Sequence, residues 1–167
     1  MSSRKQRILS SKNFKNGRFQ NFEPVQNDIL LSLKRIFNKS PQSRPDFKIQ
    51  TQVPDFTNAT SNTDITMTWF GHSTMLLELD GLKILTDPVW CDRASPVQQF
   101  GPRRFYPPVM PIEKLPKLDV IILSHNHFDH LDPAAIRKLA QTKTPIITAL
   151  GVGEYLEKFG VTPDLIT

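Results

Sequence analysis

Residues 119–130 read DVIILSHNHFDH, and this stretch decides the fold. Its first half is apolar, β-branched and uninterrupted, so it predicts a short buried strand over Asp119–Ser124. Its second half, His125–His130, holds three of the four histidines of the chain and one aspartate. Open α/β sheets commonly bind their ligands at loops that leave the carboxyl ends of strands. The sequence therefore predicts a chemically active loop directly after a buried strand.

The spacing of the polar groups in this loop predicts a metal site. Imidazole nitrogens and carboxylate oxygens are ligands that zinc and similar ions prefer. In extended backbone His125 and His127 point to the same side, because side chains alternate along the chain, so both can bind one ion. Asp129 and His130 can turn toward a second ion nearby. The alternative is a cluster of solvated histidines, or an ion bound without function, but chance rarely concentrates histidines in this way.

Asp132 belongs to a different feature, the start of a helix. It precedes Pro133 and a helix-forming run that continues to Ala140. Aspartate at the N-cap with proline at the first helical position is typical of a helix start. We therefore interpret Asp132 as an N-cap rather than as a metal ligand.

These residues resemble the metallo-β-lactamase superfamily. The stretch SHNHFDHLD over Ser124–Asp132 is similar to the superfamily's metal-binding signature. The resemblance is narrowed by WFGHST at 69–74, LTDP at 85–88, RASP at 93–96 and GPRRF at 101–105. Together they resemble the branch that contains the N-acyl-phosphatidylethanolamine-hydrolysing phospholipase D and its bacterial relatives. The resemblance runs from about Gly17 to Thr167 and is most specific between Thr68 and Asp132.

The resemblance implies an α/β fold, the N-terminal half of an αβ/βα sandwich, with two zinc ions. It implies that His125 and His127 hold one zinc with a later histidine. It implies that the second zinc is held by Asp129, by His130 and by another later histidine. A later aspartate bridges both ions. Asp129 is also the candidate catalytic residue. No histidine follows His130, and the single aspartate beyond the helix start is Asp164. We therefore expect the chain to carry part of the site, in a domain that lacks its C-terminal half.

Two residues outside the motif are candidates for supporting a ligand or contacting substrate. Asp87 follows a predicted strand and can accept a hydrogen bond from a ligand histidine, which fixes the tautomer of that histidine. The alternative for Asp87 is an Asx turn before Pro88. His72 lies in a Gly-His-Ser turn and is interpreted either as a site residue or as a structural turn histidine.

Arginines and the single cysteine are weaker candidates. Arg103 and Arg104 could contact a substrate phosphate through paired hydrogen bonds, although paired surface arginines are common. Cys91 is the one cysteine, which excludes an internal disulfide and is typical of a reducing compartment. It lacks a nearby histidine or cysteine in the sequence, so we interpret it as an ordinary loop thiol.

Charge divides the chain into two expected parts. Residues 1–60 hold 11 Lys or Arg and 4 Asp or Glu, a net charge of +7, whereas residues 61–167 hold 10 and 12, a net charge of −2. We expect a basic N-terminal extension over 1–60 and a partial metallo-β-lactamase-like domain over 61–167. Within the extension, Asp28–Phe37 predicts a short amphipathic helix, and Ser40–Phe56 predicts a proline-rich arm.

The first 21 residues hold six Lys or Arg and no acid, and several interpretations stay open. One is a solvated, mobile tail. Another is contact with an anionic membrane, where each basic group contributes roughly 1 kcal/mol. Nucleic-acid binding is the weaker third, with Phe14, Phe19 and Phe22 stacking on bases; an organelle transit peptide is a minor fourth. Signal and spanning segments are not evident, so we expect a cytoplasmic protein, peripheral to the membrane at most.

The remaining pattern predicts paired strands followed by strand–helix–strand, as in one half of an α/β sandwich. A two-residue type I′ hairpin turn is expected at Asp80-Gly81. A long irregular loop, of the kind that shapes a site, is expected over Ser95–Pro116. Further strands are expected over 65–70, 74–79, 82–86 and 145–149, and helices over 133–141 and 153–159.

The sequence favours a zinc-dependent hydrolase, a phosphodiesterase of phospholipase D type that acts on N-acyl-phosphatidylethanolamine-like lipids through a metal-activated hydroxide. The substrate follows from the resemblance alone; a lactonase or a nuclease would use the same metals. The alternative from another class is a non-catalytic fragment or partner-binding half-domain. That alternative predicts an exposed apolar sheet surface, with poor solubility or with oligomerisation, for example as a homo-oligomer.

Overall fold

The computed structural model describes residues 3–23, 44–57, 65–99 and 101–167. Backbone contacts divide the chain into two units, Met1–Ile49 and Gln50–Thr167. The helix expected over Asp28–Phe37 lies outside the described residues, as does the expected boundary between residues 60 and 61. Both stay predictions. Residues 44–56 of the expected arm contain neither helix nor strand.

The first unit contains a short helix and a small hairpin. Its elements are α1 (Ser3–Ser10), β1 (Phe14–Lys15) and β2 (Arg18–Phe19). Between the strands Asn16 and Gly17 have φ angles of 53° and 76°, and a type I′ turn needs two such left-handed residues. The rings of Phe14 and Phe19 meet edge to face with centroids 5.1 Å apart. The segment thus contains local structure, for which the Asn-Gly pair was the sequence signal, and the interpretation as a solvated, mobile tail stays a prediction.

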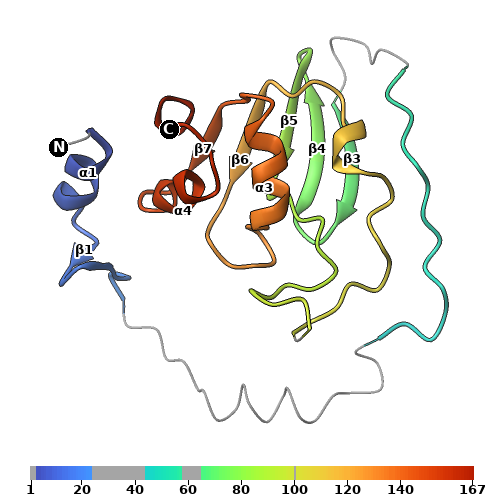
Figure 1. Ribbon diagram of the computed structural model, residues 1–167, viewed down its shortest axis with the longest axis horizontal. Coiled ribbons are helices and arrows are strands. Elements are labelled where there is room, and N and C mark those ends of the chain that lie inside the picture. Colours follow the sequence, from blue (N-terminus) through green and yellow to red (C-terminus); the bar gives the residue numbers. More distant parts are fainter. Residues whose placement is uncertain (1–2, 24–43, 58–64, 100) are drawn as a thin grey trace. The chain divides into compact units, whose positions relative to one another are not determined.

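The second unit is built on a five-stranded sheet of order β3-β4-β5-β6-β7 (Figure 1). The strands β3, β4 and β5 pair antiparallel, and β5, β6 and β7 pair parallel. The predicted α/β arrangement of paired strands followed by strand–helix–strand is confirmed. The strands are β3 (Thr66–Gly71), β4 (Thr74–Leu79), β5 (Leu82–Thr86), β6 (Val120–Leu123) and β7 (Ile146–Thr148).

The turns and helix ends follow the local sequence. Asp80 and Gly81 have φ angles of 50° and 76°, so the predicted type I′ turn is confirmed. Asp132 accepts hydrogen bonds from the backbone N–H groups of Ala134 and Ala135, so its predicted role as N-cap is also confirmed. The helices of this unit are α3 (Pro133–Ala140), α4 (Gly153–Lys158) and the short 3-10 turns η2 (Ile112–Lys114) and η3 (Pro163–Leu165).

Helices cover one face of the sheet, and Figure 1 shows α3 lying across that face. One residue from each of four strands forms a continuous row on it: Leu76, Leu85, Ile121 and Ile146, at most 1% exposed. Ile136 of α3 and Leu156 of α4 belong to the same buried cluster. This cluster is the hydrophobic core of the second unit.

The opposite face of the sheet is apolar and exposed. Trp69, Ile122 and Ile147 lie in the adjacent row and are 61%, 39% and 48% exposed. The strand β6, which the sequence predicts to be buried, is buried on one face and partly exposed on the other. The exposed apolar sheet surface that the half-domain hypothesis predicts is present.

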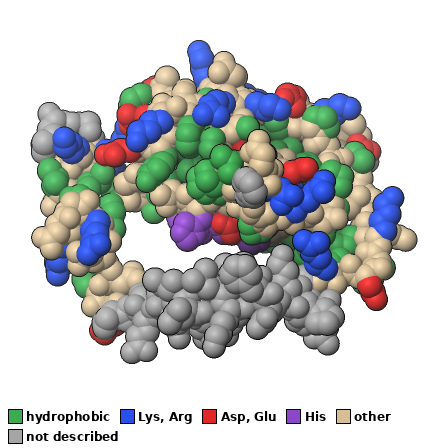
Figure 2. Space-filling view, turned by 60° about the horizontal axis from the view of Figure 1, so that its bottom comes forward, with side chains coloured by type: hydrophobic (Ala, Val, Ile, Leu, Met, Phe, Trp, Pro, Cys, Tyr) green, Lys and Arg blue, Asp and Glu red, His purple; other side chains and the backbone are tan. Residues whose placement is uncertain are grey.

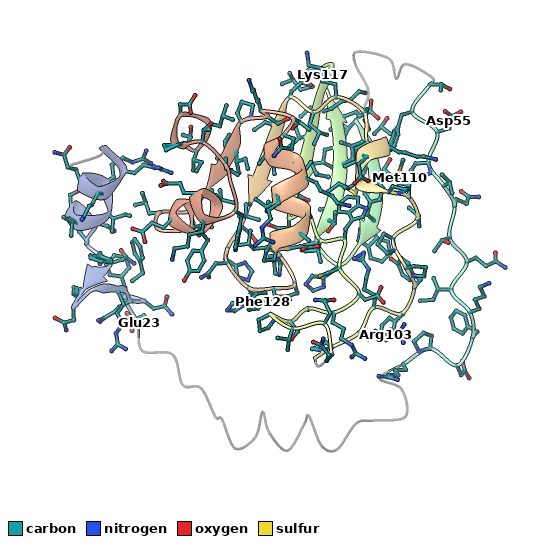
Figure 3. The ribbon with its side chains drawn as sticks, viewed as in Figure 1. Glu23, Asp55, Arg103, Met110, Lys117 and Phe128 are labelled. Atoms are coloured by element: carbon teal, nitrogen blue, oxygen red, sulfur yellow. The ribbon has the colours of Figure 1, made fainter. Side chains whose placement is uncertain are left out.

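Three loops meet at one edge of this sheet. The strand directions place the β3–β4 turn, the carboxyl end of β5 and the carboxyl end of β6 on the same edge. Figure 3 shows Phe128, in the loop after β6, and Lys117, ahead of β6, at opposite edges of the sheet. The histidine loop therefore lies beside residues that are distant in the sequence. In the described part of the chain no helix is long and apolar enough to cross a membrane.

Candidate metal centre

The four predicted ligands converge in the loop after β6. The ring centroids of His125 and His127 are 4.6 Å apart, and those of His125 and His130 are 4.0 Å apart. His125, His127 and Asp129 each offer a ligand atom within 4.8 Å of the others. Figure 2 shows histidine side chains gathered beside acidic side chains on the surface. The structure thus brings these side chains close enough to share an ion.

Asp87 lies against His130, at the carboxyl end of β5. The Nδ1 atom of His130 is 2.8 Å from Asp87 Oδ2, and the Ser73 hydroxyl is 3.0 Å from the same nitrogen. A carboxylate oxygen accepts, so His130 donates from Nδ1, and Nε2 is the nitrogen that remains to bind an ion. That Nε2 atom lies 3.6 Å from Asp129 Oδ2. The position of Asp87 suits the predicted support of a ligand histidine.

Ser124 connects the same carboxylate to a second histidine. Its backbone N–H and its hydroxyl donate to the two oxygens of Asp87, at 2.8 and 2.9 Å. The hydroxyl oxygen is also 2.9 Å from His125 Nδ1. Because the one hydroxyl proton goes to Asp87, the serine oxygen accepts from His125 Nδ1, and the Nε2 atom of His125 is left unprotonated. Sequence reasoning assigned no role to Ser124 or Ser73, although each adjoins a candidate histidine.

His72 reaches the site from the β3–β4 turn. Its Nε2 atom lies 3.1 Å from Asp129 Oδ2, and its ring centroid lies 5.0 Å from that of His130. His72 has a left-handed φ of 51°, and Gly71 before it has a φ of 109°. Trp69 donates from its indole N–H to the His72 carbonyl at 2.8 Å, which holds the turn. The structure therefore brings His72 to the same edge as the histidine loop.

The electrostatics of the loop favour the protonation states that bind metal. Burial, followed by the charges of His130 and His127, lowers the pKa of His125 below its usual value. For Asp129, burial raises the pKa, but a backbone hydrogen bond and the imidazoles of His130 and His72 outweigh it, so the net shift is downward. Neutral imidazole and ionised carboxylate are the ligand forms. Both are therefore favoured near neutral pH.

A cavity of about 570 Å³ opens beside the histidine loop. Arg104 donates to the carbonyls of Val89 and Phe70 at 2.9 and 2.8 Å, so its guanidinium connects two segments of the cavity wall. Arg103 is exposed and lies 3.7 Å from Asp92. Gly71 has a φ of 109°, which residues with a Cβ rarely adopt, and a Cβ there would lie 2.8 Å from the Tyr106 hydroxyl, so this position favours glycine. The lining residues are mostly apolar: Trp69, Gly71, His72, Val89, Cys91, Ala94, Pro102, Arg103, Arg104, Phe105, Tyr106 and Asp129.

Cys91 lines this cavity but is a poor nucleophile. Burial, followed by the charge of Asp132, raises the pKa of its thiol to about 11. Besides capping α3, Asp132 accepts hydrogen bonds from the backbone N–H groups of Trp90 and Cys91, at 2.9 and 2.8 Å. One carboxylate thus ties α3 to the loop after β5, a role that the sequence pattern does not reveal.

The donor set at this edge suits a transition-metal ion. It combines imidazole nitrogens with a carboxylate oxygen, and hydrogen bonds orient His125 and His130 through their other nitrogens. Zinc, and other ions of intermediate softness, bind such sets. The residues present therefore fit the metal that the sequence predicts.

Comparisons with known proteins agree with this architecture. The family model for the Beta-lactamase superfamily domain matches residues 83–166. An uncharacterized protein of Mycobacterium tuberculosis (strain ATCC 25618 / H37Rv) is 36% identical over 163 residues, which cover 93% of this chain and 44% of that protein. The N-acyl-phosphatidylethanolamine-hydrolyzing phospholipase D 1 of Caenorhabditis elegans is 41% identical over 106 residues, or 62% of this chain and 30% of that protein.

A third relative bears on the metal. A UPF0173 metal-dependent hydrolase of Anaeromyxobacter sp. (strain K) is 33% identical over 99 residues, which cover 59% of this chain and 32% of that protein. The chain spans less than half of the length of each of these curated relatives.

Proposed function

This chain belongs to the metallo-β-lactamase superfamily, and on that premise we propose that the protein is a zinc-dependent phosphodiesterase acting on N-acyl-phosphatidylethanolamine-like lipids. One observation carries the proposal. The side chains of His125, His127, Asp129 and His130 converge at a sheet edge, directly beside a largely apolar cavity. The similarity to a phospholipase D and to a metal-dependent hydrolase supports the same reaction class.

In the proposed mechanism, residues of this chain hold and orient the metal ligands. His125 and His127 would hold one ion through ring nitrogens, and Asp129 and His130 would hold a second. Zinc bound there would supply Lewis acidity, which lowers the pKa of a water and stabilises negative charge on phosphate oxygens. Asp87 keeps the His130 proton on Nδ1, and Ser124 does the same for His125. These contacts fix both rings before substrate arrives.

The cavity supports a substrate that joins an apolar chain to a phosphate. Trp69, Val89 and Phe105 give it an apolar wall that suits acyl chains. Asp129 lines the same cavity, so a phosphodiester beside that wall lies near the ions. Arg103 is exposed at the cavity and is the candidate partner for a phosphate oxygen.

The test compares three substrates with the zinc-loaded chain: N-acyl-phosphatidylethanolamine in mixed micelles, a long-chain lactone and single-stranded RNA. We expect release of phosphatidic acid from the lipid. His127→Ala should abolish it, whereas Asn126→Ala, a substitution in the same loop, should retain it. Cleavage of the lactone or the RNA alone would reassign the enzyme. A chain that binds two zinc ions and cleaves none of the three would favour the non-catalytic class.

The basic N-terminal unit supports contact with an anionic membrane, as part of the same proposal. Its described residues combine lysines and arginines with exposed Leu9 and Phe22. Such a combination suits the surface of an anionic bilayer. We expect binding to vesicles that contain phosphatidylserine and little binding to neutral vesicles. RNA that displaces the vesicles at equal charge concentration would favour a nucleic-acid partner instead. On this proposal the protein is cytoplasmic and peripheral to the membrane.

A further inference from the structure

We propose that His72 is itself a metal ligand, which forms a three-ligand site with Asp129 and His130. The inference rests on the proposed metal-dependent function and deepens it, because it adds a ligand from the β3–β4 turn to those of the histidine loop. These three side chains each offer a ligand atom within 4.8 Å of the others. The second ion then has three protein ligands among the described residues.

The distances in this cluster match those around one ion. Zinc lies about 2.0–2.2 Å from its nitrogen and oxygen ligands, so in a tetrahedral site neighbouring ligand atoms are about 3.3–3.6 Å apart. The Oδ2 atom of Asp129 lies 3.1 Å from His72 Nε2 and 3.6 Å from His130 Nε2. A hydrogen bond explains the shorter distance. It does not explain why the second imidazole also points its Nε2 atom at the same oxygen from beyond hydrogen-bond range.

The hydrogen bonds of His130 leave one of its nitrogens available. Its Nδ1 atom is 2.8 Å from Asp87 Oδ2, so Nε2 is the ring nitrogen that remains for an ion. That Nε2 atom lies 3.6 Å from Asp129 Oδ2. The Nε2 atom of His72 lies 3.1 Å from the same carboxylate oxygen, so His72, Asp129 and His130 form one group of possible ligands.

The exposure and backbone conformation of His72 indicate a functional role in addition to its place in the turn. Its side chain is 58% exposed, so core packing does not account for it. Its backbone is nevertheless left-handed, a conformation that is strained for a residue with a Cβ and is concentrated at functional sites. The Trp69 indole N–H donates to the His72 carbonyl at 2.8 Å and so holds the backbone of this turn.

The resulting centre has two groups that share one residue. His125 and His127 form the first group with Asp129, and His72 and His130 form the second group with it. Asp129 is therefore the one residue that both groups share.

The test measures metal binding and does not depend on turnover. Wild-type chain, His72→Ala and Asn126→Ala are stripped of metal and titrated with Zn²⁺ by calorimetry and with Co²⁺ by visible absorption. We expect two ions in the wild type and at least a roughly tenfold weaker second ion in His72→Ala, with altered Co²⁺ bands. Asn126→Ala, at an exposed position of the same loop, keeps every candidate ligand and should retain both ions. Added imidazole should restore the second ion in His72→Ala.

A direct readout covers the case in which His72→Ala does not fold. In ¹⁵N-histidine-labelled wild-type chain, Zn²⁺ should shift the Nε2 resonance of His72 together with that of His130. A His72 nitrogen that stays unshifted at saturation, or a folded His72→Ala chain with wild-type affinity for both ions, would overturn the inference. Loss of lipid hydrolysis with intact His72-dependent binding would instead refute the proposed substrate alone.

Discussion

The two faces of the five-stranded sheet share one backbone and have opposite environments. On one face the row that contains Leu76, Leu85 and Ile121 is fully buried against α3 and α4. On the other face the adjacent row exposes Trp69 and Ile122. Both rows are mostly apolar and each contains one threonine, so composition does not distinguish them. An apolar strand pattern therefore shows that a strand can be buried. Which face of the sheet becomes buried depends on the elements that pack against it.

The same comparison separates stability from function. The covered face holds the core, and the loops at one edge hold the candidate ligands. Asp132 connects the two, because its carboxylate caps α3 and also binds the loop after β5. The following predictions test how far the two faces differ, in order of decreasing effect.

The largest difference should come from two neighbouring isoleucines of β6. Ile121→Ala opens a cavity in the core and should lower the free energy of unfolding by about 2–5 kcal/mol. Ile122→Ala removes an exposed side chain and should cost less than about 1 kcal/mol. Urea denaturation of both variants measures the contrast. Equal losses would show that the second face is also covered in solution.

Asp132→Ala should destabilise the chain by about 2–4 kcal/mol, since it removes a helix cap and leaves the Trp90 and Cys91 N–H groups without their acceptor. Asp164→Ala is the matched control, because Asp164 is exposed in η3 and caps nothing. That control should stay within about 0.5 kcal/mol of wild type by thermal unfolding. A similar loss of stability in both variants would contradict the role of Asp132 in connecting α3 to the loop after β5.

Cys91 should react slowly with thiol reagents. The pKa of its thiol is raised to about 11, so the reactive thiolate is scarce at pH 8, and its rate should rise as the pH approaches that value. Allowing for the greater nucleophilicity of a basic thiolate, alkylation by iodoacetamide at pH 8 should be roughly tenfold slower than that of a free cysteine. Unfolding in urea should abolish the difference. A rate equal to that of free cysteine in the folded chain would contradict the buried setting of this loop.

The smallest effect on stability should come from polar substitutions on the exposed face. Met67→Gln combined with Ile147→Gln should change the free energy of unfolding by no more than about 0.5 kcal/mol per site. The same variant should bind less of the dye ANS, because the exposed apolar surface is reduced. Sedimentation at several concentrations would show whether self-association falls in parallel. Unchanged dye binding would place the apolar surface elsewhere.

Local patterns predicted the elements of the second unit well. The Asp80-Gly81 turn, the cap at Asp132 and the strand before His125 depend on residues that are neighbours in the chain, and each was found close to its predicted place. In the first unit the Asn16-Gly17 pair was a comparable local signal for a hairpin turn. The prediction there was based on the basic charge pattern and missed the hairpin. Backbone preference acts over a few residues, so sequence shows it directly.

The candidate centre was predictable only in part. The ligand group within His125–His130 is local, and the spacing of its histidines indicated it. The contacts of Asp87 with His130 and of His72 with Asp129 span 43 and 57 residues, and they exist because β3 to β6 bring their ends to one edge. The family resemblance suggested that Asp87 lies near the site, but no sequence pattern specified the atoms that meet.

The sequence by itself determined the α/β order of elements, the turns, the helix cap and the type of chemistry available after β6. These features depend on residue type and short spacing. The tertiary structure alone decided which face of the sheet became the core, how Ser124 and Asp87 orient two histidines, and that His72 meets Asp129. Those outcomes depend on strand pairing and on helix packing over long separations, where many arrangements satisfy the same local pattern.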